Sequence, residues 1–364
     1  MIEFRGVSKT YDDGTRAVDG IDLTIETGSL TVFVGPSGCG KTTTMRMINR
    51  MVEPTTGTVL VDGEDIRGIP PATLRKSMGY VLQGAGLFPH RTAVDNVATT
   101  LRLAGVPRRQ ARTRAQETLR LVRLRPELDE RYPAQLSGGQ QQRVGVARAL
   151  AADPPILLMD EPFSAVDPVV RAELQQELLR LRETLSQTIV FVTHDIDEAL
   201  LLGDRIVVFG PGGAIHQHAD PQSLLERPAD PFVAQMVGRD RGFRSLGFRT
   251  ADLDVLPLER ADERRTDEQR ASDDSAPSVP VPGGASGWSL ALDADGRPAA
   301  WLSTQERIPA GEGWPAGGGL RQALDAVLSS PTEAAPAVDE TGAVIGWITR
   351  SAVLAAVDGI RDRS

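Results

Sequence analysis

The chain has 364 residues, 40% of them hydrophobic and 24% charged, a globular composition with room for two or more domains. Its net charge of −9 provides no overall positive field, so we expect no nucleic acid as a partner. No stretch approaches the roughly 18 uninterrupted apolar residues that span a bilayer. Residues 1–5 lack the layout of a secretory signal, so we expect the chain to stay in the cytosol.

Short apolar runs alternate with amphipathic segments over residues 1–240, a pattern that predicts an α/β domain. Four runs are typical of buried strands: residues 30–34, 156–159, 189–193 and 206–209. From about 92 to 150 helix-forming residues dominate, which predicts a helical insertion. The clearest helix covers 169–186, because an apolar face recurs there and Asp167-Pro168 provides an N-cap followed by proline.

A glycine-rich loop connects the predicted strand 30–34 to a predicted helix, as a phosphate-binding loop requires. Its backbone N–H groups and the helix dipole favour the β- and γ-phosphates of ATP. Lys41 is expected to neutralise phosphate charge, and the Thr42 hydroxyl to bind Mg²⁺. Cys39, the only cysteine, excludes an internal disulfide and is expected to be a small filler. The predicted ATP-binding residues of this segment are Gly35, Pro36, Ser37, Gly38, Cys39, Gly40, Lys41, Thr42 and Thr43.

Two acidic residues follow the apolar run 156–159. Asp160 is placed to hold Mg²⁺ through water, and Glu161 to polarise the water that attacks the γ-phosphate. A second glycine-rich motif, residues 136–140, reads LSGGQ. This motif can present a hydroxyl and backbone N–H groups to a phosphate at the start of a helix.

The phosphate loop, the LSGGQ motif and the Asp160-Glu161 pair resemble those of ATP-binding cassette (ABC) ATPases. The resemblance implies a phosphate-loop nucleotide-binding domain with a helical subdomain. It also implies a dimer, of two copies or of this chain with a similar ATPase. In that dimer each LSGGQ motif contacts the ATP held by the other subunit, through Ser137, Gly138, Gly139 and Gln140.

The same resemblance assigns roles to single residues. Gln83 matches the family's glutamine that contacts Mg²⁺ and the attacking water, so the implied metal-binding residues are Thr42, Gln83 and Asp160. His194 matches the switch histidine at the γ-phosphate, which makes Glu161, His194 and Gln83 the implied catalytic residues. Tyr11 matches the aromatic residue that stacks on adenine, with simple packing as the alternative. Asp167 lies in the short loop that couples the two active sites.

The last third of the chain has a different composition. Residues 259–287 are rich in Asp, Glu, Arg, Ser, Pro and Gly, which predicts a flexible linker. Beyond it, residues 291–303 and 337–349 resemble each other: ALDADG and later WLS in the first copy, AVDETG and later WIT in the second. Each copy predicts a strand, an Asp/Gly turn and a strand.

This repeat resembles a degenerate tandem pair of cystathionine-β-synthase-type (CBS) regulatory modules, which are α+β. Residues 241–287 would then hold the degenerate first portion and the linker, and residues 288–364 the CBS-like region. CBS modules that hold adenosine often carry Thr or Ser with Asp three residues later. Here Thr349 is followed at that spacing by Ala352, and Ser303 by Glu306. The resemblance therefore implies weak or absent adenosine binding at the second copy.

Residues 49–55 (NRMVEPT) and 86–90 (GLFPH), with the CBS-like tail, resemble the ATPases of importers for quaternary amines such as glycine betaine, choline and carnitine. The implied protein hydrolyses ATP at the cytoplasmic face of the cell membrane. It drives a separate transmembrane permease, to which an extracytoplasmic substrate-binding protein delivers the osmoprotectant.

Three alternatives remain open. The chain can serve an importer of another small solute, such as an amino acid. A soluble ABC ATPase of translation or DNA repair is the second, although that class usually carries two cassettes or long insertions. The third is a mainly regulatory protein, against which Glu161 and His194 argue. The sequence does not identify the solute, because the binding protein and permease select it.

Overall fold

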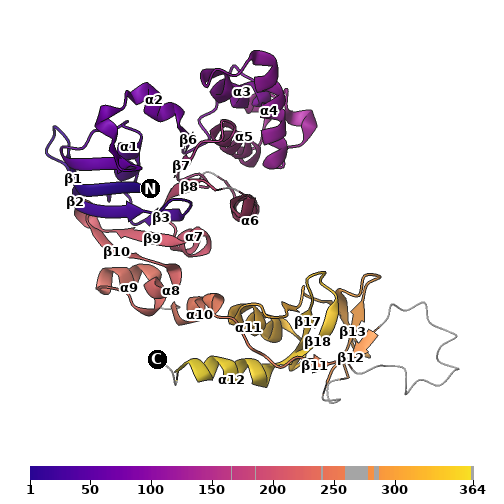
Figure 1. Cartoon of the computed structure of the whole chain (residues 1–364). Coiled ribbons are helices and arrows are strands. Elements are labelled where there is room, and N and C mark those ends of the chain that lie inside the picture. Colours follow the sequence, from indigo (N-terminus) through magenta and orange to yellow (C-terminus); the bar gives the residue numbers. More distant parts are fainter. Residues whose placement is uncertain (165, 185, 239–240, 259–277, 283–286, 362–364) are drawn as a thin grey trace. The chain divides into compact units, whose positions relative to one another are not determined.

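The computed structural model divides the chain into two units, Met1–Gly238 and Arg239–Ser364, each with its own hydrophobic core (Figure 1). The structure describes residues 1–164, 166–184, 186–238, 241–258, 278–282 and 287–361. Most of the predicted linker at 259–287 therefore lies outside the described residues. No helix in the described ranges combines the length and apolar character that a membrane crossing requires.

The first unit is built on a six-stranded sheet whose inner strands are parallel. In spatial order the strands are β10 (Ile215–Ala219), β9 (Arg205–Phe209), β3 (Leu30–Val34), β8 (Thr188–Thr193), β7 (Ile156–Asp160) and β6 (Met78–Val81). The four strands predicted from apolar runs are all present, and β3, β7 and β8 are buried along their whole length. Continuous apolar runs suit this position, because a central parallel strand packs on both faces.

An antiparallel sheet and one helix cover one face of this sheet. The antiparallel strands in order are β2 (Arg16–Ile25), β1 (Ile2–Thr10), β4 (Thr56–Val61) and β5 (Glu64–Asp65). Helix α1 (Lys41–Ile48) contacts β2, β4 and β8, so it lies between the two sheets. Phe4, Met45 and Val190 belong to the core formed there.

Helices cover the opposite face. Between β6 and β7 the chain forms no strand, and α3, α4 and α5 form a helical group (Figure 1). Helix α6 follows β7, as the apolar periodicity predicts, and α7 follows β8. The helices of this unit after α1 are α2 (Pro71–Lys76), α3 (Ala93–Leu103), α4 (Arg108–Leu121), α5 (Gly138–Leu150), α6 (Pro168–Thr184), α7 (Ile196–Leu202), α8 (Pro221–Glu226) and α9 (Pro231–Val237).

The second unit contains two four-stranded sheets. One has the order β11 (Leu256–Pro257), β18 (Val344–Thr349), β17 (Ala334–Val338) and β16 (Trp314–Pro315). The other is an antiparallel meander of β12 (Ser278–Pro280), β13 (Ser289–Leu292), β14 (Pro298–Leu302) and β15 (Arg307–Pro309). The helices are α10 (Arg241–Ser245), α11 (Leu320–Ser329) and α12 (Arg350–Arg361).

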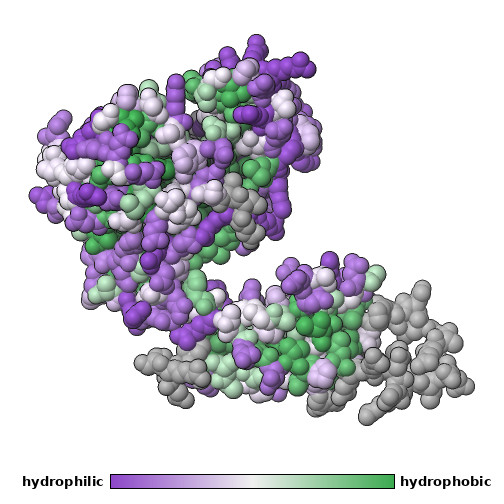
Figure 2. Space-filling model, viewed as in Figure 1, coloured by the Kyte–Doolittle hydropathy of each residue, from purple (hydrophilic) through white to green (hydrophobic). Residues whose placement is uncertain are grey.

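Two hydrophobic clusters hold the second unit together. Helices α11 and α12 share one core with β17 and β18. Leu290 and Trp301 of the meander share another with Val338 and Trp347, and the rings of Trp301 and Trp347 lie 6.0 Å apart. Figure 2 shows hydrophobic residues gathered over β11, β17 and β18, where Ile345 is 43% exposed.

The predicted repeat is confirmed as two antiparallel hairpins, β13–β14 and β17–β18. In the first turn the Asp293 carboxylate accepts hydrogen bonds from the backbone N–H groups of Asp295 and Arg297. In the second turn Asp339 accepts the equivalent bonds from Thr341 and Ala343. The turns also contact each other, because the Val344 N–H donates to the Gly296 carbonyl at 2.9 Å.

After the hairpins the two copies differ. Helix α12 follows the second hairpin, whereas Ser303 to Glu306 form a turn that leads into β15. The Ser303 hydroxyl accepts from the Glu306 N–H, and the Ser303 N–H donates to the Glu306 carbonyl at 2.9 Å, which closes the turn. Only the second copy combines two helices with its hairpin in the described residues.

All four tryptophans, at 288, 301, 314 and 347, belong to the second unit, so their fluorescence reports the unfolding of that unit alone. Leu290 is fully buried between the two sheets. We expect Leu290→Ala to lower the free energy of unfolding by about 2–5 kcal/mol in a urea titration. Leu328→Ala, at a side chain that is 61% exposed, is the control and should change it by less than about 0.5 kcal/mol. Equal effects would contradict this packing.

Candidate functional site

The phosphate loop forms where β3 ends and α1 begins. Gly40 has a φ of 92°, and a Cβ there would lie 2.0 Å from the Ala17 carbonyl oxygen, so only glycine fits. The Lys41 side chain is buried and donates to the carbonyl oxygens of Gly35 at 2.7 Å and Pro36 at 2.8 Å. Its ammonium therefore lies inside the curve of the loop. Cys39 is also buried, and burial raises the pKa of its thiol.

The Asp160 carboxylate, at the end of β7, meets the loop from the other side. The Thr42 hydroxyl donates to Asp160 Oδ1 at 2.8 Å. Arg46 Nη2 and the Tyr80 hydroxyl both lie 3.3 Å from Asp160 Oδ2. Asp160 is 3% exposed, so these partners compensate a carboxylate that is almost removed from water. Burial raises the pKa of Tyr80, and a hydrogen bond with Tyr80 raises that of Arg46.

Glu161 and His194 lie together at the same edge of the sheet. His194 Nδ1 is 3.2 Å from Glu161 Oε2. The Glu161 N–H donates to the Val192 carbonyl at 3.0 Å, which ties the end of β7 to β8. Glu161 has a φ of 44°, a left-handed conformation that is rare for a residue with a side chain. The fold thus holds Glu161 in a strained conformation with its carboxylate facing His194.

Tyr11 lies next to the phosphate loop. Its hydroxyl is 3.4 Å from the Thr43 hydroxyl, and its side chain is 40% exposed. The Lys9 ammonium lies 5.2 Å from the ring centroid. The ring is therefore accessible beside the loop and is not packed beneath the sheet.

The LSGGQ motif forms the start of α5. Ser137 and Gln140 make a capping box, in which the Ser137 hydroxyl accepts from the Gln140 N–H and the Gln140 side chain accepts from the Ser137 N–H. Ser137 and Gly138 are exposed. At Gly139 a Cβ would lie 2.4 Å from a Val170 methyl group of α6. Asp167 caps α6 by accepting from the Val170 N–H at 3.1 Å.

Gln83 is exposed at the start of a loop with unusual backbone geometry. Gly84, Ala85 and Gly86 all have positive φ angles, of 70°, 61° and 53°. Arg148, near the end of α5, donates to the carbonyl oxygens of Ala85 at 2.9 Å and Gly86 at 2.8 Å. Burial lowers the pKa of Arg148. The helix that begins at the LSGGQ motif therefore also holds the loop after Gln83.

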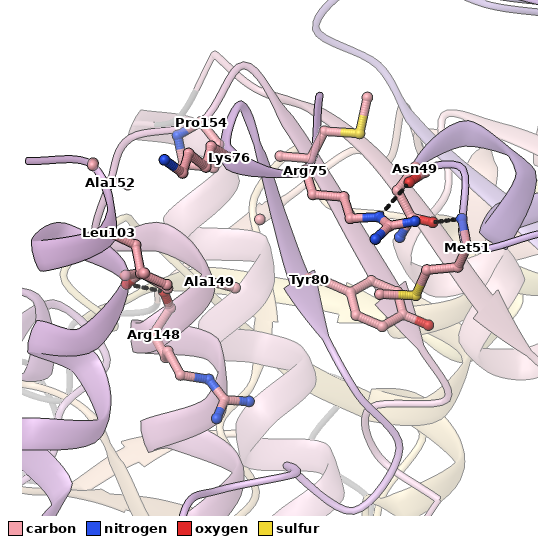
Figure 3. A pocket seen from close by; sticks show the side chains of 14 residues that line it. Asn49, Met51, Arg75, Lys76, Tyr80, Leu103, Arg148, Ala149, Ala152 and Pro154 are labelled. Carbon is pink, nitrogen blue, oxygen red and sulfur yellow. Dashed lines mark hydrogen bonds between the residues drawn. The ribbon is translucent and has the colours of Figure 1, made fainter. Parts of the chain in front are cut away.

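Arg148 also lines a mostly apolar pocket of about 270 Å³. Figure 3 shows Met51 and Tyr80 on one side of the pocket and Leu103 and Arg148 on the other. Met51 and Leu103 are 50% and 61% exposed. The pocket thus lies between two parts of the first unit. On one side are β6 and the segment after α1, and on the other are α3 and α5 of the helical group.

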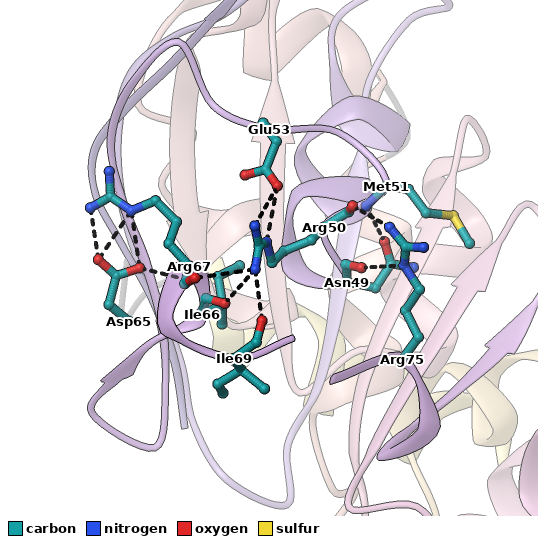
Figure 4. A network of polar contacts seen from close by, with 9 residues as sticks. All are labelled: Asn49, Arg50, Met51, Glu53, Asp65, Ile66, Arg67, Ile69 and Arg75. Carbon is teal, nitrogen blue, oxygen red and sulfur yellow. Dashed lines mark hydrogen bonds and ion pairs between the residues drawn. The ribbon is translucent and has the colours of Figure 1, made fainter. Parts of the chain in front are cut away.

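A polar network fixes the segment after α1 that forms one wall of this pocket. Arg50 donates to the Ile69 carbonyl at 2.7 Å and to Glu53 at 2.9 Å (Figure 4). Arg75 donates to the carbonyl oxygen of Asn49 at 3.0 Å and to that of Arg50. Because these carbonyl oxygens have charged donors, the wall is held by several directed bonds.

The structure thus brings Lys41, Thr42 and Asp160 together, and it pairs Glu161 with His194. The sequence reasoning missed Arg46, Tyr80 and Arg148. Arg46 follows Thr42 by one helical turn, which is a signal that sequence reading can use. Tyr80 and Arg148 gave no such signal, because their contacts depend on the order of the strands and on the path of α5.

These features define a phosphate-loop nucleotide-binding domain. The family model "ABC transporter" matches residues 18–164. The choline transport ATP-binding protein OpuBA of Bacillus subtilis (strain 168) is 51% identical over 245 residues, which are 67% of this chain and 64% of OpuBA. The glycine betaine uptake system ATP-binding protein YehX of Escherichia coli (strain K12) is 51% identical over 239 residues, 66% of this chain and 77% of YehX.

A solved structure extends the comparison to the fold. The dimeric, post-hydrolysis ATP-binding cassette MJ0796 bound to ADP and Pi superimposes with a TM-score of 0.56 at 35% identity, covering 61% of this chain and 99% of that one. The chain belongs to the ABC transporter family of ATP-binding proteins.

The conformation of Gly40 yields a test of the loop. We expect Gly40→Ala to weaken ATP binding by about tenfold or more, because the added methyl group displaces the loop from the Ala17 carbonyl. Fluorescence titration with a labelled ATP analogue measures this. Gly63→Ala is the matched control, since Gly63 has a similar φ of 83° with no atom within 4 Å of its Cβ position. If both variants bind equally, the close approach at Gly40 does not matter for the nucleotide.

Proposed function

We propose that this chain is the ATP-hydrolysing subunit of an importer and powers the uptake of quaternary ammonium osmoprotectants through a separate permease. The observation that carries the proposal is the paired arrangement of Glu161 with His194 beside Thr42 and Asp160. A carboxylate and an imidazole at the same sheet edge as a phosphate loop suit hydrolysis, whereas nucleotide binding alone requires neither.

Each of the site residues has a separate role in the proposed ATP hydrolysis. The loop around Lys41 holds the phosphates, and the exposed Tyr11 ring stacks on the adenine. Glu161 accepts a hydrogen bond from the attacking water. His194 and Gln83 orient the water and the γ-phosphate. The donor set fits Mg²⁺, because the Thr42 hydroxyl and the Gln83 amide oxygen are oxygen ligands, the Asp160 carboxylate beside Thr42 would hold the ion through water, and Mg²⁺ takes its remaining ligands from phosphate and water. Bound there, Mg²⁺ neutralises the charge that develops on the phosphate oxygens.

Two subunits share the nucleotides in this proposal. Ser137 and the first helical residues Gly138 and Gly139 form the start of α5, where Ser137 and Gly138 are exposed and the helix dipole favours an anion. The matching cassette MJ0796 is described as a dimer bound to ADP and Pi. We infer that the LSGGQ motif of each subunit contacts the γ-phosphate held by the other, with Asp167 at the junction.

The pocket lined by Met51, Leu103 and Arg148 is the proposed docking place for the permease. Its exposed Met51 and Leu103 offer apolar surface, and Arg75 and Arg148 add positive charge at its lining. Such a groove suits a short amphipathic helix. Because Arg148 also holds the loop after Gln83, a helix seated there would reach the catalytic edge through that loop. Docking would place the chain at the cytoplasmic face of the membrane.

The names of the relatives support the substrate class, since OpuBA is named for choline transport and YehX for glycine betaine uptake.

The tail is proposed to regulate transport as a CBS-like module. The succession β16, α11, β17, β18 and α12 supports this, as does the pairing of the two turns. The Thr349 hydroxyl accepts from the Ala352 N–H, and Ala352 offers no carboxylate for ribose, so we propose weak or absent adenosine binding there.

Reconstituted vesicles test the function. The chain is assembled with its neighbouring permease and binding protein, and ATPase activity and uptake are measured with glycine betaine, choline and carnitine in turn. We expect at least one of them to stimulate hydrolysis and to accumulate. Stimulation only by another solute, such as an amino acid, would contradict the substrate class while leaving the ATPase proposal intact.

Glu161→Gln tests the proposed base. We expect kcat for ATP hydrolysis to fall by about 100-fold or more, because the amide cannot polarise the attacking water. ATP binding should persist, so a closed dimer should accumulate, as size-exclusion chromatography with ATP detects. Glu64→Gln, at an exposed strand end, is the control. Retention of wild-type turnover by Glu161→Gln would remove Glu161 from this role.

A further inference from the structure

A buried carboxylate contacts the residue that precedes His194. Glu198, in α7, is 6% exposed. Its Oε2 accepts from the Thr193 hydroxyl at 2.6 Å, and its Oε1 accepts from Gln175 Nε2 at 3.0 Å. Thr193 ends β8 and directly precedes His194. The carboxylate therefore links α7 to α6 and to the last residue of β8, which precedes His194.

The Thr193 hydroxyl connects to both sides of His194. It donates to Glu198, and it accepts from the backbone N–H of Asp195 at 3.0 Å. The Asp195 carboxylate in turn accepts from the N–H groups of Asp197 at 2.8 Å and Glu198 at 3.4 Å. These bonds fix the backbone on either side of His194. Its ring is 57% exposed, so the position of the ring depends on this backbone.

Burial of Glu198 needs a reason beyond packing. A carboxyl group loses hydration when it is buried, and burial raises the pKa of Glu198. A hydrophobic side chain of similar size would fill the space without this cost. A carboxylate offers what a hydrophobic side chain lacks, two acceptors directed at Thr193 and at Gln175. The hydrogen bonds are therefore the specific property of this position.

The same network reaches α6. Gln175 is an α6 residue, and Arg171 of α6 lies 3.9 Å from the Asp195 carboxylate. The Arg171 N–H donates to the Asp167 carbonyl at 2.9 Å. Two side chains of α6 thus contact the segment around His194, and the capping residue Asp167 directly precedes the same helix.

We propose that Glu198 is a positioning residue that holds His194 in contact with Glu161, through Thr193, and links this contact to α6 through Gln175. The proposal rests on the proposed function, because it concerns the rate of ATP hydrolysis. It assigns to Glu198 no contact with the nucleotide. Loss of the network releases His194 from Glu161 and leaves the phosphate loop intact.

Steady-state ATP hydrolysis by the full chain tests this. We expect Glu198→Ala to lower kcat by about tenfold or more, with KM for ATP within about twofold of wild type. Glu198→Gln should keep kcat within about threefold, because its amide oxygen accepts from Thr193 and Gln175 can turn its own oxygen toward the amide N–H. If Glu198 had a purely structural role, Glu198→Ala would lower the amount of folded protein, and the folded fraction would not show a lower kcat at unchanged KM.

A double-mutant cycle with His194→Ala shows whether Glu198 acts through the histidine. In the His194→Ala background, Glu198→Ala should cause less than about a twofold further loss, since both changes remove the same contact. Gln175→Leu should lower kcat by about threefold or more, whereas Gln176→Leu, at the exposed neighbour, is the matched control and should not.

The outcomes separate this proposal from the function on which it rests. A wild-type chain that binds ATP without hydrolysing it would overturn the ATPase function, and the role of Glu198 with it. A hydrolysing wild type with unchanged kcat in Glu198→Ala would overturn only the role of Glu198. If Glu198→Ala fails to fold, Gln175→Leu decides, and wild-type kcat in that variant overturns the proposal.

Discussion

The parallel pairing of β3, β8 and β7 is the constraint on which the site depends. In this pairing Val34 lies opposite Thr193, and Asp160 lies opposite Val192. Parallel strands end at the same edge, so the phosphate loop after β3, the acidic pair after β7 and the histidine after β8 meet there, although they are far apart in sequence. A slip of one register would also turn the buried side chains to the wrong faces.

Local sequence patterns predicted individual strands and helices but not their arrangement in space. The apolar runs identified β3 and β7, because a strand buried on both faces has no polar alternation, and the leucine periodicity identified α6. The order of the strands could not be read in this way, since β3 and β7 are separated by β8 in space. The contact of Tyr80 with Asp160 depends on that order, and the contact of Glu198 with Gln175 depends on how α6 and α7 pack, so no local motif predicts either contact.

The tail shows the same limit at smaller scale. The Asp/Gly turns could be predicted, because Asp293 and Asp339 satisfy backbone N–H groups only a few residues away. The secondary structure that follows each hairpin could not be predicted. Ser303 and Thr349 both cap a following backbone N–H, yet one begins a turn into a strand and the other a helix. The strand after Ser303, β15, pairs with β14, whereas the helix after Thr349, α12, packs on α11 and β18.

The left-handed backbone conformation of Glu161 lowers the stability of the fold at the residue whose carboxylate contacts His194. With a φ of 44°, this position disfavours any residue that has a Cβ, by about 1–3 kcal/mol. Glycine would relieve that strain, and it would also remove the carboxylate that faces His194. Glycine is therefore a stabilising substitution at this position, and selection for thermal resistance alone would favour it at the expense of the Glu161–His194 contact.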